Sequence, residues 1–193
     1  MRIDQRITLS AVVLAATALT ACGTSSDSSA PATSSAPAST SATTVVPSNI
    51  TAPGTKMKFG DRAVVKWQDG YVGITVTGVD SGDTAGFRQK FGENANDLEP
   101  YYVRYTVENL GGTDLSVKNP PLVRAALADG TSTGTFITGS VDQCETVLTP
   151  QTFTTVGAQV TECQLDAAST GDQVGGARYA QGEYDEQPLL WTK

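Results

Sequence analysis

The stretch Tyr101–Asn109, YYVRYTVEN, decides the fold class because its side chains alternate with a period of two residues. The odd-numbered positions put two tyrosines and two valines on one face, whereas the even-numbered positions include Arg104 and Glu108. This alternation is typical of a half-buried β-strand, in which successive side chains point to opposite faces. The stretch therefore predicts an all-β protein.

Further strands are predicted on both sides of this stretch. Asp69-Gly70 and Asp129-Gly130 are strong signals for tight turns, and residues 81–97 are predicted to form a polar loop. No segment has the periodicity of a helix. The other expected strands are Ala63–Trp67, Tyr71–Val79, Asp114–Val117, Leu122–Ala128, Gln151–Val156, Ala158–Leu165 and Gln187–Thr192. Seven to nine short strands separated by turns predict an antiparallel β-sandwich, with Trp67 and Trp191 among its largest core residues.

Two segments resemble a known family. Residues 102–109, YVRYTVEN, and the later Leu127-Ala128-Asp129-Gly130 are similar to immunoglobulin-like modules of actinobacterial lipoproteins and secreted proteins, which include a mycobacterial secreted immunogenic protein. The likeness spans about residues 58–192, and Cys163 stands where the family usually has an aromatic residue. It implies an immunoglobulin-like β-sandwich of unknown function outside the cytoplasm. It implies no catalytic residues.

The N-terminus has the pattern of a lipoprotein signal peptide. Arg2 and Arg6 precede an apolar run, Ile7–Leu19, whose 13 residues are too few to span a bilayer. Leu19-Thr20-Ala21-Cys22 resembles the lipobox, in which a thiol after two small residues receives lipid. We therefore expect residues 1–21 to be removed and Cys22 to carry fatty acyl chains such as palmitate. The alternative is an ordinary signal peptide with a chance cysteine.

Residues 22–54 are predicted to be a tether between the lipid and the domain at residues 55–193. The segment consists almost entirely of Ser, Thr, Ala and Pro. Such a composition buries too little apolar surface to offset the entropy of ordering, and therefore predicts disorder. The expected location is the extracytoplasmic face of the cell membrane, with the membrane as a partner through the lipid on Cys22.

Charge and composition exclude several functions. The chain has 13 basic and 20 acidic residues, a net charge of −7. Loss of residues 1–21 removes two basic residues and one acidic residue, which leaves 13 − 2 = 11 and 20 − 1 = 19, a net charge of −8. Such a surface repels nucleic acid. The absence of histidine excludes Ser-His-Asp and Cys-His catalysis, so we expect no enzyme activity, no catalytic residue and no cofactor.

Two cysteines remain after lipidation, Cys144 and Cys163. Disulfides persist outside the cytoplasm, so we expect these two to be bridged, with a stabilisation of about 3 kcal/mol in the chain-entropy model. The alternative is two free thiols.

Candidate binding residues have simpler structural explanations. The carboxylates suited to calcium do not have the spacing of an EF-hand, so we expect solvated loops and no metal site; they are Asp80, Asp83, Glu93, Asp97 and Glu99. The aromatic residues suited to stacking on sugars all lie in expected strands, which favours core packing; they are Trp67, Trp191, Tyr101 and Tyr102. The segment 171–176, GDQVGG, lacks the phosphate-binding motifs and is expected to be a flexible loop.

These observations favour a non-catalytic binding or interaction module displayed outside the membrane. Its partner would be a protein, a cell-wall polymer or a small ligand, and the expected contact regions are residues 81–97 and 171–187. One alternative is a structural accessory subunit of a cell-envelope complex. The other is a cell-wall hydrolase that uses paired carboxylates.

Overall fold

The computed structural model describes residues 45–193, which form a β-sandwich of two four-stranded sheets. The predicted signal peptide, Cys22 and the tether up to residue 44 lie outside the described residues. Along the chain, the elements are β1 (Lys56–Lys58), β2 (Arg62–Trp67), β3 (Gly70–Ser81), α1 (Thr84–Phe91), η1 (Gly92–Ala95), β4 (Leu98–Asn109), β5 (Val123–Leu127), β6 (Gln159–Ser169), β7 (Val174–Tyr179), η2 (Gly182–Tyr184) and β8 (Leu189–Thr192).

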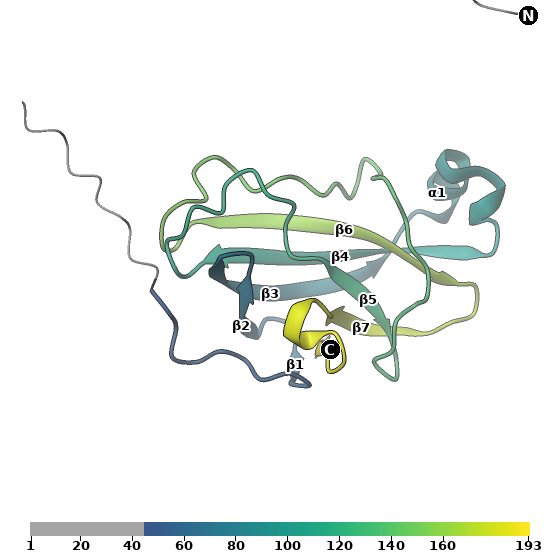
Figure 1. Ribbon diagram of the computed structural model, residues 1–193. Coiled ribbons are helices and arrows are strands. Elements are labelled where there is room, and N and C mark those ends of the chain that lie inside the picture. The colour runs from purple at the N-terminus through teal and green to yellow at the C-terminus, as the bar shows by residue number, and fades with distance from the viewer. Residues whose placement is uncertain (1–44) are drawn as a thin grey trace, which may run out of the picture. The chain divides into compact units, whose positions relative to one another are not determined.

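The two sheets have the strand orders β1-β8-β7-β5 and β2-β3-β4-β6. The predicted all-β sandwich is therefore confirmed, and its pairings are antiparallel except that β1 pairs with β8 in parallel. The long strands β3, β4 and β6 lie side by side along the domain, and α1 lies at one end (Figure 1). The edge strands β5 and β6 belong to different sheets, and this arrangement positions the site described below.

The core between the sheets follows from strand alternation. Val72, Ile74 and Val76 of β3 are fully buried on one face, as expected. Trp191 is fully buried, and its indole N–H donates to the main-chain oxygen of Asp61 at 3.0 Å. Trp67 belongs to the same cluster. The preference for core packing over sugar stacking is thus confirmed for both tryptophans.

The outer face of β4 is covered at one end. Tyr102 alternates with the core residues but is only 6% exposed, because it packs with Phe87 of α1 and with Leu165 and Cys163 of β6. The prediction of a polar loop over residues 81–97 was wrong for this reason. Asp83 accepts a hydrogen bond from the Ala85 N–H and caps a helix of eight residues, which places Phe87 over the sheet.

Two predicted strands are turns. In residues 114–117, the Asp114 carboxylate accepts from the Ser116 N–H and hydroxyl, which favours a turn over an extended strand. In residues 151–156, the Phe153 N–H donates to the Pro150 oxygen, and the Phe153 ring fills the core. Apolar residues in both segments gave a strand-like pattern, but local hydrogen bonds from side chains and the main chain hold the backbone in turns.

Two other segments are more ordered than expected. The predicted flexible loop at 171–176 contains the start of β7. A Cβ on Gly176 would collide with the Trp191 main-chain oxygen, so the close approach of the strands requires glycine. Residues 45–54, which composition places in the tether, are hydrogen-bonded to the sandwich. The Thr51 N–H donates to the Val64 oxygen, and the Thr51 hydroxyl accepts from the Val64 N–H.

Candidate ligand-binding cleft

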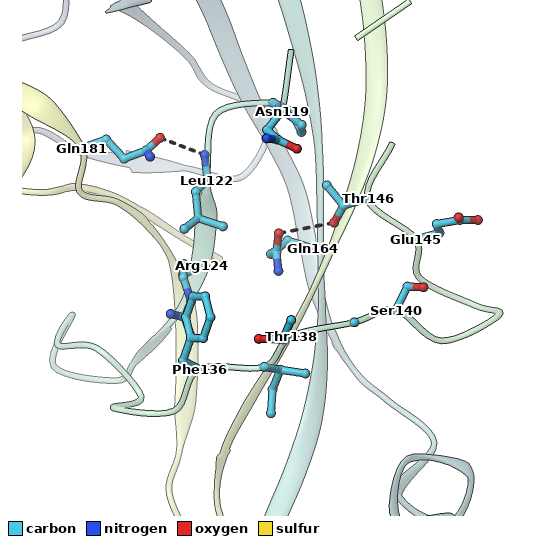
Figure 2. Close-up of a pocket in the computed structure, with 13 residues that line it drawn as sticks. Asn119, Leu122, Arg124, Phe136, Thr138, Ser140, Glu145, Thr146, Gln164 and Gln181 are labelled. Atoms are coloured by element: carbon cyan, nitrogen blue, oxygen red, sulfur yellow. Dashed lines mark hydrogen bonds between the residues drawn. The ribbon is translucent and has the colours of Figure 1, made fainter. Parts of the chain in front are cut away.

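A cleft of about 620 Å³ opens between the free edges of β5 and β6. Its outer wall is the crossover segment, residues 128–158, which connects these two strands. Figure 2 shows side chains from both strands and from the crossover segment around the opening. The volume lies within the range of sites that bind small ligands.

A buried ion pair forms the inner support of the cleft. Asp166 of β6 is fully buried, and its two carboxylate oxygens accept from Arg124 Nε at 3.0 Å and Nη2 at 2.6 Å. The same carboxylate accepts from the main-chain N–H groups of Ala125 and Ala167, both at 2.9 Å. Asp166 thus binds the free edge of β5 to β6 and fixes the position of Arg124.

One aromatic ring is presented to solvent at the cleft. Phe136 is 73% exposed, and its ring lies over the Arg124 guanidinium, 5.4 Å from ring centroid to Cζ. Arg124 also donates to the main-chain oxygen of Thr135. Because Arg124 is fixed by Asp166, it holds the adjacent phenyl ring at the mouth of the cleft.

The remaining lining is rich in amides and hydroxyls. The Thr146 hydroxyl donates to the Cys163 oxygen at 2.9 Å and lies 3.3 Å from Gln164 Oε1, and Gln181 Oε1 accepts from the Leu122 N–H at 2.9 Å. Four polar lining side chains make no hydrogen bond within residues 45–193: Asn119, Thr138, Ser140 and Glu145. Together with the Gln181 amide nitrogen, they offer unused donors and acceptors to a polar ligand.

The predicted disulfide holds the outer wall. Cys144 in the crossover segment is bonded to Cys163 of β6, with Cα atoms 5.1 Å apart. Thr149 adds a second attachment, because its hydroxyl donates to the Leu115 oxygen at 2.6 Å. The crossover segment is therefore fastened to the sandwich on both sides of the cleft residues Glu145 and Thr146.

Glu162 lies on the same face of β6 as Gln164 and Asp166 but does not line the cleft. It is 2% exposed, Oε2 accepts from the Val147 N–H at 3.1 Å, and Oε1 has no partner among the described residues. Burial raises the pKa of this carboxyl from 4.5 to about 7, and the Val147 N–H opposes the rise. The Glu162 side chain therefore holds a proton more tightly in the folded chain than in the unfolded chain.

We expect Glu162 to make stability depend on pH. The stabilisation is present in full below pH 4.5 and is lost as pH rises through about 7. The wild type should lose about 3 kcal/mol of unfolding free energy relative to Glu162→Gln between pH 4.5 and pH 8. Urea denaturation at both values measures this difference. Glu186→Gln, at an exposed glutamate, should lose as much stability as the wild type between the two pH values. An equal loss of unfolding free energy in Glu162→Gln and the wild type would contradict the expectation.

The structure does not gather the sequence's candidate carboxylates into one site. Asp80 pairs with Arg104 at 3.2 Å, Asp83 caps α1, and Glu99 Oε2 lies 3.5 Å from the Tyr101 hydroxyl. Within residues 45–193, no three Cys, Asp or Glu side chains form a group able to hold a metal ion. The same part of the chain contains no helix long and apolar enough to cross a bilayer.

The cleft residues were missed by sequence reasoning, apart from Gln181 in the predicted contact region 171–187. A signal was present in β6, where Glu162, Gln164 and Asp166 alternate with the apolar Cys163 and Leu165. Such a pattern is normally read as a polar face toward solvent. Here the polar face turns toward the interior and the cleft, because α1 and residues 141–144 cover the apolar face.

Comparison with known proteins adds one structural likeness. No family model matches the chain, and no curated protein matches it. Among solved structures, the chain is similar to MPT63, a secreted protein from Mycobacterium tuberculosis, with 18% identity and a TM-score of 0.48 over 74% of this chain and 99% of that chain. A likeness at this level assigns no ligand, partner or site residue to the present chain.

Proposed function

We propose that the chain is a lipid-anchored, extracytoplasmic binding protein without catalytic activity, and that the cleft between β5 and β6 binds a saccharide. The single observation that carries this proposal is the combination in one cleft of an exposed phenyl ring with unpaired amide and hydroxyl groups. A sugar has apolar C–H faces suited to the Phe136 ring and hydroxyl groups suited to Asn119, Thr138 and Gln181. The lipoprotein signal at Cys22 supports the location.

The chemistry of the lining supports binding over hydrolysis. Glycoside hydrolysis needs two carboxyl groups that face the scissile bond. Of the residues that line the cleft, Glu145 alone carries a carboxyl group. The nearby Asp166 is fully buried, and its carboxylate accepts hydrogen bonds from four N–H groups. The proposed role is therefore to hold a saccharide, either free or as part of an envelope polymer.

We expect Phe136→Ala to weaken saccharide binding about threefold to tenfold, because burial of about 40 Å² of the ring contributes about 1 kcal/mol at about 25 cal/mol per Å². The full chain, solubilised in detergent, is titrated with a panel of soluble oligosaccharides by calorimetry. Val156→Ala is the matched control, since Val156 is 62% exposed and does not line the cleft.

Two results would contradict the proposal. One is that no oligosaccharide binds, and the other is that a saccharide binds equally well to Phe136→Ala and to the wild type. Stoichiometric co-purification of the chain with one envelope protein, without saccharide binding, would instead favour the structural accessory subunit.

A further inference from the structure

The outer face of the β1-β8-β7-β5 sheet carries a concentration of positive charge in an acidic chain. Its strands contain four basic residues and no acidic residue, although the whole chain has a net charge of −7. Arg124 of β5 is the direct cross-strand partner of Arg178 of β7, and Arg178 is in register with Leu190, which is in register with Lys56. These side chains alternate with the buried Ala125, Ala177 and Trp191 and therefore share the outer face.

The two arginines differ in their partners. Arg124 is neutralised by Asp166 at 2.6 Å. Arg178 makes no ion pair or side-chain hydrogen bond within residues 45–193, and its buried Nε has no partner. Because Asp166 already neutralises Arg124, the positive charge of this pair that lacks a counter-ion among the described residues is that of Arg178. An anion that binds to the Arg178 guanidinium would supply this counter-ion.

A cavity is present at this position. It has a volume of about 290 Å³ and is lined by Arg178, Arg124, Ser132, Leu122, Ala180 and Gln181. The Ser132 hydroxyl accepts from the Gly134 N–H and keeps its own proton available for donation. Asp129, in the neighbouring turn, is held by Thr131, whose N–H and hydroxyl both donate to Oδ1. The cavity therefore presents N–H and O–H donors without a carboxylate in its lining.

This cavity adjoins the proposed saccharide cleft, because Leu122, Arg124 and Gln181 line both. We infer that the ligand is an anionic saccharide, whose neutral part lies in the cleft and whose carboxylate or phosphate group binds to Arg178. The inference rests on the proposed function and adds the charge of the ligand. The planar guanidinium suits both anions, since it donates two parallel hydrogen bonds to paired oxygens.

The test compares a charged probe with an uncharged probe of the same shape. Trigalacturonate and its full methyl ester are titrated separately into the detergent-solubilised full chain, and inorganic phosphate is titrated as a third probe. The wild type should bind the acid at least tenfold more tightly than the ester. Arg178→Gln should lose about tenfold to a hundredfold in affinity for the acid, because hydrogen bonds to a charged group contribute about 1.5–3 kcal/mol, and should bind the ester as the wild type does.

Lys66→Gln is the matched control, because it removes one exposed positive charge from β2 in the other sheet; it should leave the preference for the acid intact. Arg178→Lys keeps the charge and should retain part of the preference. Equal melting temperatures for these variants and the wild type establish that they fold. Phosphate that binds in an Arg178-dependent manner, where trigalacturonate does not, would support the anion site with phosphate as its ligand group.

The outcomes separate the two proposals. Equal affinity for the acid and the ester, unchanged in Arg178→Gln, would overturn the anionic ligand and leave Phe136-dependent saccharide binding in place. Failure of all three probes to bind would overturn the anionic ligand, and only failure of the whole oligosaccharide panel as well would overturn the saccharide cleft.

Discussion

Asp166→Ala should lower the free energy of unfolding by about 4 kcal/mol, because it leaves a largely buried arginine without its counter-ion. The Arg124 side chain is only 20% exposed and loses two hydrogen bonds, at 3.0 and 2.6 Å. The main-chain N–H groups of Ala125 and Ala167 lose an acceptor as well. Urea denaturation followed by tryptophan fluorescence measures the loss, and Trp67 and Trp191 report directly on the core.

A matched control and a double variant separate the ion pair from a general effect of substitution. Asp142→Ala, at an exposed position of the crossover segment, should change stability by less than about 0.5 kcal/mol. The double variant Asp166→Leu with Arg124→Met should lose less unfolding free energy than the two single variants lose together. Each single variant leaves one buried charge without a partner, whereas the double variant leaves none. A loss below about 1 kcal/mol for Asp166→Ala would show that water replaces the carboxylate without difficulty.

The strands that alternate strongly were predictable from the sequence. In β4, buried residues alternate with partly exposed ones from Val103 to Asn109, and in β3 the buried Val72, Ile74 and Val76 recur at every second position. In long paired strands, burial of one face determines the register. The turns at residues 67–70 and 127–130 were predictable for a similar reason, since the chemistry of Asp-Gly is local, although the central residues are Gln68-Asp69 and Ala128-Asp129 and Gly70 already belongs to β3. The pairing of Cys144 with Cys163 was predictable because the chain is expected outside the cytoplasm and because two cysteines remain after lipidation of Cys22.

The segments between β4 and β6 were less predictable, because their conformation depends on contacts distant in sequence. Val117 has a φ of 53°, unusual for a β-branched residue, and its N–H donates to the oxygen of Thr149. The helix α1 is only eight residues long and buries one residue, Phe87. Its position depends on packing against Tyr102 and Leu165 in other strands, and a contact of this kind produces no periodic pattern in the helix sequence itself.

The cleft was unpredictable for the same reason. Its lining comes from five separate parts of the chain, represented by Leu122, Phe136, Thr146, Gln164 and Gln181. These residues follow no recognisable motif in the sequence. The position of Arg178 opposite Arg124 becomes clear only when β5 and β7 are placed in register. Sequence reasoning could therefore name a binding module, but the chemistry of its ligand follows from the arrangement of the strands.

The largest change in behaviour is expected from Cys22→Ala, which removes the predicted site of lipidation. Cys22 lies outside the described residues, so the expectation rests on Leu19-Thr20-Ala21-Cys22. One acyl chain gives only marginal membrane binding, whereas two or more anchor a protein stably, since each buried methylene contributes about 0.8 kcal/mol.

The wild type should lack residues 1–21, incorporate labelled palmitate and partition into the detergent phase. Cys22→Ala should incorporate no label and keep residues 1–21, which mass spectrometry detects. Cys163→Ala is the control and should remain labelled, and reduction should leave the label in place because a thioether resists thiol reagents. Partition of the wild type wholly into the aqueous phase, or persistence of the label in Cys22→Ala, would refute the lipid anchor without affecting the cleft, which lies within residues 119–181.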